Sequence, residues 1–181
     1  MQNSLFPTLI TFNKDEINYY INQLVIQITD RHIQNIQNLI FIGLDDHSKY
    51  IATRIAKKII QHYKQTIPVG KIDPSLYLPK PSDNNFISFQ NAEIPCRIHN
   101  KTVILFDSIL HTGAHCLAAL HALADIETTQ NIELACLIDR GHRKFPVFAT
   151  YCSKQIQSSI SDQFQLKLME IDGEDKLITI P

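Results

Sequence analysis

The apolar residues in the first half of the chain alternate between helical spacing and continuous runs. From Lys14 to His32 they recur at helical spacing, after Asn13 as a favourable N-cap, which predicts an amphipathic helix. The continuous apolar run from Leu39 to Leu44 predicts a buried strand, and residues from Ser48 to Tyr63 return to helical spacing. Residues 67–77 are expected to form the next strand. This order is typical of an α/β protein.

The second half continues this alternation. Val103 to Phe106 predicts another buried strand, residues 107–113 are expected to form a polar turn, and residues 114–123 have helical spacing. A strand that ends at Ile138 is expected next. Short strands are expected near Val147–Cys152, Phe164–Met169 and Lys176–Ile180. The pattern predicts a parallel sheet flanked by helices, with a ligand at the carboxyl ends of the strands.

Residues 78–99 form an insert that interrupts the alternation. The segment contains Pro79, Pro81 and Pro95, a polar run from Ser82 to Asn85 and a short apolar piece from Phe86 to Phe89. Prolines and polar turn residues disfavour regular elements. We therefore expect a mobile loop or a hairpin here.

Composition indicates an ordinary globular protein. With 181 residues and 44% hydrophobic content, the chain can bury one sizeable core, so we expect a single domain over residues 1–181. No apolar stretch long enough for a membrane span or a signal peptide occurs, so a cytoplasmic location is expected. The four cysteines lack C-x-x-C spacing and are expected to be reduced structural thiols. A net charge of −1 provides no general attraction to nucleic acid.

The segment from Val103 to His115 carries the clearest chemical signal. A turn between a strand and a helix collects backbone N–H groups at the positive end of the helix. Thr112 and Gly113 allow the backbone to approach a phosphate oxygen closely. The segment therefore predicts a phosphate-binding turn.

The chain resembles the pyrimidine-operon regulator family of type I phosphoribosyltransferases over nearly its whole length. The run from Ile138 to Pro146, with Asp-Arg-Gly-His-Arg inside it, is the most specific part of the resemblance. The other matching residues are Val69–Asp73, Ser75–Tyr77, Ile132–Ala135, Tyr151, Lys154, Ser158 and Glu170–Asp172. The resemblance implies transfer of a phosphoribosyl group from phosphoribosyl pyrophosphate to uracil with Mg²⁺, and binding of leader RNA in response to uridine nucleotides.

The resemblance also implies roles for residues of the turn. Asp107 and Ser108 occupy the positions of two adjacent catalytic acids that bind the ribose hydroxyls. Ser108 cannot supply the second charge, so transition-state stabilisation is expected to be weaker. The residues expected to hold the 5′-phosphate are Ile109, Leu110, His111, Thr112, Gly113 and Ala114. Family members carry tyrosine in place of His111, and arginine and threonine in place of Ala114 and His115.

Asp45, Asp46, His47 and Ser48 lie at the position of the family's pyrophosphate loop, which normally carries basic residues and a glycine. Two carboxylates there repel pyrophosphate, unless Mg²⁺ bridges them to the phosphates. The alternative, which we favour, is that the two aspartates cap the helix that follows. In the insert, Leu78, Pro79 and Lys80 replace an arginine and two acids of the family.

The run after Ile138 has two implied roles. Arg140, Gly141 and His142 are expected to bind the base or nucleotide, whereas Arg143, Lys144 and Lys154 retain part of the family's RNA surface. The spacing of His111, His115 and Cys116 is also compatible with zinc, but a fourth ligand is missing, so we expect no metal site.

Three hypotheses for the function follow. We favour a regulator that senses a pyrimidine nucleotide such as UMP, acts through a partner, and has weakened or lost catalysis. The alternatives are an active uracil phosphoribosyltransferase, which would need Mg²⁺, and an RNA-binding transcription attenuator. We expect a homodimer or a higher oligomer, weak RNA binding, and no membrane partner.

Overall fold

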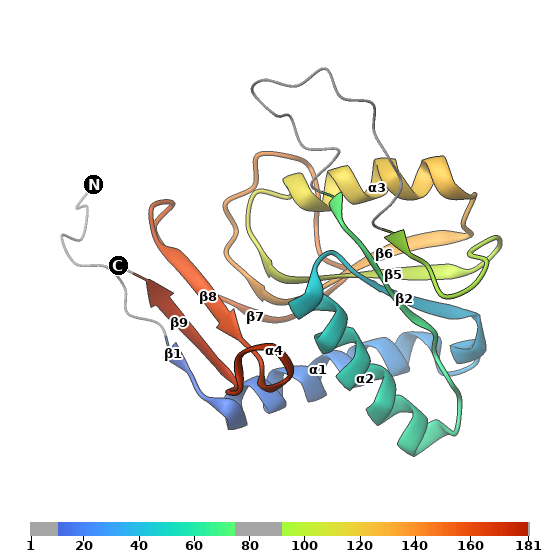
Figure 1. Ribbon diagram of the computed structural model, residues 1–181, viewed down its shortest axis with the longest axis horizontal. Helices are drawn as coiled ribbons and strands as arrows, with labels where there is room; N and C mark the ends of the chain where they lie inside the picture. The colour runs from blue at the N-terminus through green and yellow to red at the C-terminus, as the bar shows by residue number, and fades with distance from the viewer. Residues whose placement is uncertain (1–10, 75–91, 181) are drawn as a thin grey trace.

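A computed structural model describes residues 11–74 and 92–180. Its centre is a six-stranded sheet with the strand order β4-β3-β2-β5-β6-β7 (Figure 1). The strands are β2 (Leu39–Gly43), β3 (Val69–Ile72), β4 (Ala92–Glu93), β5 (Thr102–Leu110), β6 (Asn131–Asp139) and β7 (Tyr151–Gln155). All neighbours pair in parallel except β3 and β4. The predicted parallel α/β fold is therefore confirmed.

Helices cover both faces of this sheet. Helix α1 (Lys14–His32) and helix α2 (Asp46–Tyr63) lie on one face, and α3 (Ala114–Ile126) lies on the other (Figure 1). The apolar side chains of the central strands alternate between the two layers, because successive residues of a strand point to opposite faces. Phe41 and Phe106 pack with α1 and α2, whereas Ile42 and Leu105 pack with α3.

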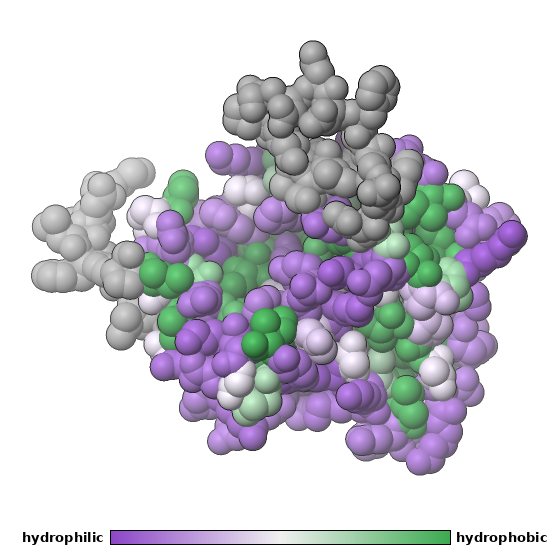
Figure 2. Space-filling view, in the orientation of Figure 1, coloured by the Kyte–Doolittle hydropathy of each residue, from purple (hydrophilic) through white to green (hydrophobic). Residues whose placement is uncertain are grey.

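A smaller antiparallel sheet lies beside the central one. Its strands, in the order β1-β9-β8, are β1 (Thr11–Phe12), β8 (Gln163–Lys167) and β9 (Lys176–Ile180), with the short helix α4 (Met169–Asp172) between β8 and β9. Arg54 of α2 connects the two parts, because its guanidinium forms ion pairs with Glu170 and Asp175. The face shown in Figure 2 is largely hydrophilic, with separate apolar patches.

Several predicted boundaries were wrong. Strand β5 continues through Leu110, so residues 107–110 are strand and the turn is limited to residues 111–113. Their continued pairing with β6, up to Leu110 opposite Asp139, outweighs the local polar character. Helix α2 begins at Asp46 rather than at Ser48, and the strand expected near Val147–Cys152 begins only at Tyr151.

Parts of the insert lie outside the described residues. Those parts are residues 78–91, so the mobile loop, the apolar piece from Phe86 to Phe89 and the changes at Leu78, Pro79 and Lys80 remain predictions. The described remainder contains β4, which pairs antiparallel with β3. In the part of the chain that the structure describes, no helix is long and apolar enough to cross a membrane.

Candidate functional site

The carboxyl ends of β5 and β6 bring the two sequence motifs together. Leu110 and Asp139 are register partners at these ends. The turn at residues 111–113 therefore lies next to the loop at residues 140–147. The parallel sheet thus gathers both sets of predicted site residues at one edge, as expected for an α/β fold.

A cavity of about 230 Å³ lies at this edge, and we call it the phosphate cavity. It is lined by Asp107, Ile109, His111, Thr112, Gly113, Ala114, His115, Arg140 and Phe164. The first amides of a helix lack intrahelical acceptors and carry the positive end of its dipole, so the start of α3 favours an anion here. Of the predicted phosphate residues, only Leu110 is absent from the lining; it is a buried core residue.

Gly113 is required by both its conformation and its packing. Its φ angle is 82°, in the left-handed region that side chains disfavour. A Cβ atom at this position would lie 3.2 Å from Cβ of Val147. The turn is therefore packed tightly against the loop from β6.

That loop also binds the carbonyl oxygens of the turn. The backbone N–H of Arg140 donates to the Leu110 carbonyl at 3.0 Å, and the N–H of Lys144 donates to the Thr112 carbonyl at 3.0 Å. Nη1 of Arg143 donates to the His111 carbonyl at 2.6 Å. The carbonyl oxygens of Leu110, His111 and Thr112 therefore already have donors. They do not compete with a bound anion for the backbone N–H groups at the start of α3.

Asp107 provides the carboxylate of the phosphate cavity. Burial raises its pKa, and the negative charge of Asp45 raises it further. The N–H of Ile109 and the thiol of Cys116 donate to this carboxylate, at 3.3 and 3.5 Å. Asp107 is therefore positioned to accept hydrogen bonds from ligand hydroxyl groups while already bearing a desolvation cost.

His111 lines the same cavity and carries a buried polar atom without a partner in the described part of the chain. Its Nε2 atom is buried and has no hydrogen-bond partner among the described residues. Burial lowers its pKa, and the positive charges of Arg140, His142, Lys144 and Arg143 lower it further. A buried polar atom without a partner costs about 1–3 kcal/mol.

Ser108 has a different environment from Asp107. The residue is 6% exposed, and its hydroxyl lies 2.9 Å from the hydroxyl of Ser48 in α2. Its backbone N–H also donates to Ser48 at 3.1 Å. Ser108 does not line the phosphate cavity. Only one of the two predicted catalytic positions therefore contributes to it.

The turn between β2 and α2 is acidic, and its charges are already engaged. Asp45 is the N-cap of α2 and accepts from the N–H of Ser48 at 2.6 Å, which confirms its predicted capping role. Asp46, which was also predicted to cap this helix, is instead its first residue and forms an ion pair with Lys71 at 2.8 Å. His47 lies 3.1 Å from Asp172 of α4. Of the four predicted pyrophosphate-loop residues, none therefore offers an unengaged cation.

A larger cavity of about 670 Å³ adjoins the first and shares Arg140 with it; we call it the loop cavity. It is lined by Asp139, Arg140, Gly141, His142, Arg143, Phe148, Gln155, Ile156, Gln157 and Ser158. All three residues predicted to bind a base or nucleotide are in this set. Gly141 has a φ angle of 73°, which explains the need for glycine.

Arg140 is held between the two cavities by the segment after β7. Its Nε donates to Ser158 at 3.1 Å, its Nη2 donates to the Ser159 carbonyl at 2.8 Å, and its guanidinium carbon lies 4.7 Å from the ring centre of Phe164. Nε2 of His142 lies 2.8 Å from the Ser158 carbonyl. The sequence contained no local signal for Phe164, because its contact with Arg140 arises only in the folded chain.

The three predicted RNA residues have unequal surroundings. Arg143 is engaged internally, because Nε donates to Val147 at 2.8 Å and Nη2 pairs with Asp139 at 2.6 Å, in addition to its bond with His111. Lys144 and Lys154 are exposed. Two lysines are thus available to a phosphate backbone, whereas Arg143 braces the loop.

Comparison with known proteins agrees with this architecture. The model of the phosphoribosyl transferase domain family matches residues 14–170. A Bacillus subtilis (strain 168) protein named "Bifunctional protein PyrR" is 32% identical over 169 residues, which cover 92% of this chain and 93% of the relative. A protein of the same name from Latilactobacillus sakei is 37% identical over 145 residues, which cover 78% of this chain and 81% of that relative.

Solved structures show the same fold. A hypoxanthine phosphoribosyltransferase from Staphylococcus aureus has a TM-score of 0.65 at 19% identity, with 99% of this chain and 98% of that chain covered. A hypoxanthine-guanine phosphoribosyltransferase from Bacillus anthracis has a TM-score of 0.66 at 16% identity, with 94% and 97% covered. The chain therefore belongs to the phosphoribosyl transferase domain family, as a PyrR-like type I phosphoribosyltransferase.

Proposed function

We propose that this chain is a regulator of pyrimidine metabolism that responds to a pyrimidine nucleotide such as UMP and has weakened or lost uracil phosphoribosyltransferase activity. The proposal is supported by the contrast between two neighbouring parts of the site. Asp107 and the turn at the start of α3 share a cavity suited to a ribose 5′-phosphate, while the neighbouring turn that would receive pyrophosphate is acidic. The site therefore favours the nucleotide product over the pyrophosphate-bearing substrate.

The half of the site that favours a nucleotide keeps Asp107, Thr112 and Gly113. The phosphate cavity combines the N-terminus of α3, the unsatisfied Nε2 of His111 and the nearby Arg140. The amides of α3 and the Arg140 guanidinium can donate hydrogen bonds to a phosphate group. The adjoining loop cavity has room for a base, and Arg140, Gly141 and His142 line it.

The half that would hold pyrophosphate is electrostatically unfavourable. Each carboxylate repels a unit negative charge by roughly 4 kcal/mol at 4 Å and an effective dielectric constant of 20, before screening by salt. Lys71 offsets part of the repulsion from Asp46, because the two side chains form an ion pair, whereas Asp45 caps α2 and Lys49 is paired with Glu93. Phosphoribosyl pyrophosphate should therefore bind more weakly than UMP.

The chemical step is weakened for a separate reason. Ser108 has no charge with which to stabilise an oxocarbenium-like transition state, and its hydroxyl is paired with Ser48. By analogy with the loss of one oxyanion-hole donor, the missing interaction costs about 2.7–4 kcal/mol, or roughly a 100- to 1,000-fold decrease in rate.

Mg²⁺ is needed only if the chain retains catalytic activity. The ion is usually bound through one or two carboxylates together with substrate phosphates and water. Asp107 and Asp45 are the carboxylates that this site offers, and they are close enough for the charge of Asp45 to raise the pKa of Asp107. Mg²⁺ would supply positive charge between them and a pyrophosphate group.

We expect RNA to bind this chain more weakly than a pyrimidine nucleotide does. Lys144 and Lys154 are exposed, but Arg143 is committed to Asp139, Val147 and His111. Each phosphate contact of a single strand contributes a log–log salt slope of about −0.7, so two contacts give roughly −1.4. We propose that regulation acts mainly through nucleotide binding and a protein partner, with the chain as one domain in a homodimer or higher oligomer.

The direct test is a steady-state assay of UMP formation from uracil, phosphoribosyl pyrophosphate and Mg²⁺. We expect kcat/KM at least 100-fold below that of a PyrR relative assayed in parallel, because Ser108 and the acidic turn act together. A rate equal to that of the relative, with ordinary saturation, would establish the active-enzyme alternative. Submicromolar binding that prefers a leader hairpin over a scrambled control would instead establish RNA attenuation.

A further inference from the structure

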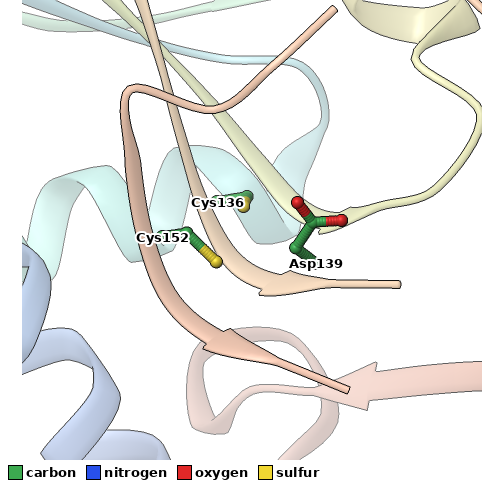
Figure 3. A group of neighbouring side chains, drawn as sticks. All are labelled: Cys136, Asp139 and Cys152. Carbon is green, nitrogen blue, oxygen red and sulfur yellow. The ribbon is translucent and has the colours of Figure 1, made fainter. Parts of the chain in front are cut away.

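Two cysteines lie side by side on adjacent strands, next to the loop cavity. Cys136 of β6 and Cys152 of β7 are register partners. Figure 3 shows their side chains close to the carboxylate of Asp139, which ends β6. The two sulfur atoms and one carboxylate oxygen lie within 4.8 Å of one another. Such a group has two possible chemistries, a metal site or an oxidisable dithiol.

The carboxylate disfavours the metal site. One oxygen of Asp139 accepts from the N–H of Gly141 at 2.8 Å, and the other accepts from Nη2 of Arg143 at 2.6 Å. A metal would have to displace one of these donors. Only two thiols then remain as ligands, whereas a structural zinc site normally uses four.

The strand geometry favours a bond between the sulfur atoms. Paired strands lie about 4.7–4.9 Å apart, which falls within the Cα separation of about 4.4–6.8 Å found in disulfides. As register partners, Cys136 and Cys152 present their side chains to the same face of the sheet. A disulfide brings its two Cβ atoms to about 3.5–4.5 Å, slightly less than the spacing of paired strands, so its formation requires rotation of the thiols and a small local approach of β6 and β7.

The two thiols also differ in exposure and in pKa, and a two-step oxidation requires such a difference. Cys136 is fully buried, whereas Cys152 is partly exposed and meets an oxidant first. The neighbouring Cys136 thiol lowers the pKa of Cys152 against the opposing effects of burial and of the Asp139 carboxylate, while the pKa of Cys136 is raised by Cys152 and by burial. The thiolate is the reactive form of cysteine, so Cys152 has the properties of the attacking residue.

We propose that Cys136 and Cys152 form a redox-active dithiol that hydrogen peroxide converts to a disulfide. The Cys152 thiolate attacks one peroxide oxygen, the O–O bond breaks, hydroxide leaves and a sulfenic acid forms. The Cys136 sulfur then attacks the Cys152 sulfur, and the hydroxyl group leaves as water with the proton of Cys136. Together with the proton that Cys152 first released, two thiols and one peroxide give one disulfide and two waters.

The location connects this modification to the nucleotide site. The disulfide would close a covalent ring around residues 137–151. That ring contains the loop that lines the larger cavity and binds the carbonyl oxygens of the phosphate turn. Oxidation would therefore restrain the loop, including Arg140, without chemically modifying any residue that lines the phosphate cavity.

The test is peroxide treatment of the reduced, full-length chain, followed by thiol titration in denaturant. We expect the four thiols to fall to two, with a mass loss of two hydrogen atoms. Trypsin should then release residues 102–140 linked to residues 145–154. Because the first peptide also contains Cys116, the link must persist in Cys116→Ser and disappear in Cys136→Ser.

The matched controls separate this pair from exposed cysteine in general. Cys96→Ser removes an exposed thiol and should still lose two thiols on oxidation, whereas Cys152→Ser should form no internal link. Cys136→Val serves as a second variant of the buried position if the serine variant does not fold. Oxygen addition without a link, or a link to another cysteine, would overturn the proposal. So would stoichiometric Zn²⁺ binding that protects both Cys136 and Cys152 from alkylation, because it would establish a metal site.

Discussion

Neighbouring residues of β5 meet opposite environments, and this difference sets the chemistry of the site. Asp107 faces the phosphate cavity, while Ser108 pairs with Ser48 beneath α2. Successive side chains of a strand point to opposite faces, so neither residue can take the place of the other. Of the two adjacent catalytic positions, only Asp107 therefore keeps an acid, and burial makes its charge costly.

The raised pKa of Asp107 predicts a pH-dependent effect on stability. Since the folded pKa lies above the unfolded value, the stabilisation from Asp107 is complete at low pH and is lost as pH rises through the folded pKa. We expect Asp107→Asn to raise the melting temperature relative to wild type, and to do so more at pH 7 than at pH 4. Thermal unfolding across this range measures the difference.

Asp46→Asn is the control for that experiment. Lys71 lowers the pKa of Asp46, so its stabilisation is present at neutral pH and is lost as pH falls through the folded pKa. This variant should therefore not raise the melting temperature at pH 7. An Asp107→Asn variant that is less stable than wild type at neutral pH would show that the ionised carboxylate does not destabilise the folded state.

The pairing of Ser48 with Ser108 predicts non-additive substitutions. Ser108→Asp would place a carboxylate against the Ser48 side chain in a buried site, at a cost of about 1–3 kcal/mol. Ser48→Gly in the same chain removes the facing side chain and should recover part of this loss. We expect a double-mutant cycle by urea unfolding to give a coupling energy of about 1 kcal/mol or more. Additive effects would mean that the two side chains do not share this space.

At the scale of elements, the loop at residues 140–147 supports the phosphate turn. Backbone N–H groups and Arg143 of this loop bind the carbonyl oxygens at Leu110, His111 and Thr112. Val147 packs against Gly113. The two sequence motifs, one after β5 and one after β6, therefore form one structural unit.

This unit predicts that Arg143 acts in nucleotide binding without touching the nucleotide's phosphate. Arg143→Ala removes the side-chain bonds to Asp139, Val147 and His111, and should lower the free energy of unfolding by about 1.5–3 kcal/mol. UMP affinity, measured by calorimetry, should fall at least tenfold because the turn loses its support. Lys144→Ala, at an exposed neighbouring position, should change stability by less than about 0.5 kcal/mol. Equal effects of the two variants would contradict the bracing role.

The sequence predicted elements better than it predicted contacts. Apolar periodicity located α1 from Lys14 to His32 and β9 from Lys176 to Ile180, because burial of one face determines that pattern. It ended β5 too early, because pairing with β6 extends the strand through polar residues such as Asp107. It could not show the contact of Phe164 with Arg140, which depends on tertiary packing.

At the scale of the whole molecule, exposed apolar residues near the loop support an assembly. Phe148 is 76% exposed and Phe145, three residues earlier in the same loop, is 37% exposed, so both rings leave apolar surface in contact with water. We expect light scattering at micromolar concentration to give at least a homodimer mass. Phe148→Asp should shift the protein towards the monomer, because a carboxylate is costly in an apolar interface. A wild-type monomer would contradict this prediction.

The preference for UMP over phosphoribosyl pyrophosphate is tested most directly by two calorimetric titrations of the wild-type chain. One uses UMP alone, and the other uses phosphoribosyl pyrophosphate with Mg²⁺. We expect UMP to bind at least tenfold more tightly, because the phosphate cavity keeps Asp107 and the amides at the start of α3, whereas Asp45 and Asp46 occupy the pyrophosphate turn. Binding of phosphoribosyl pyrophosphate as tight as that of UMP would contradict it.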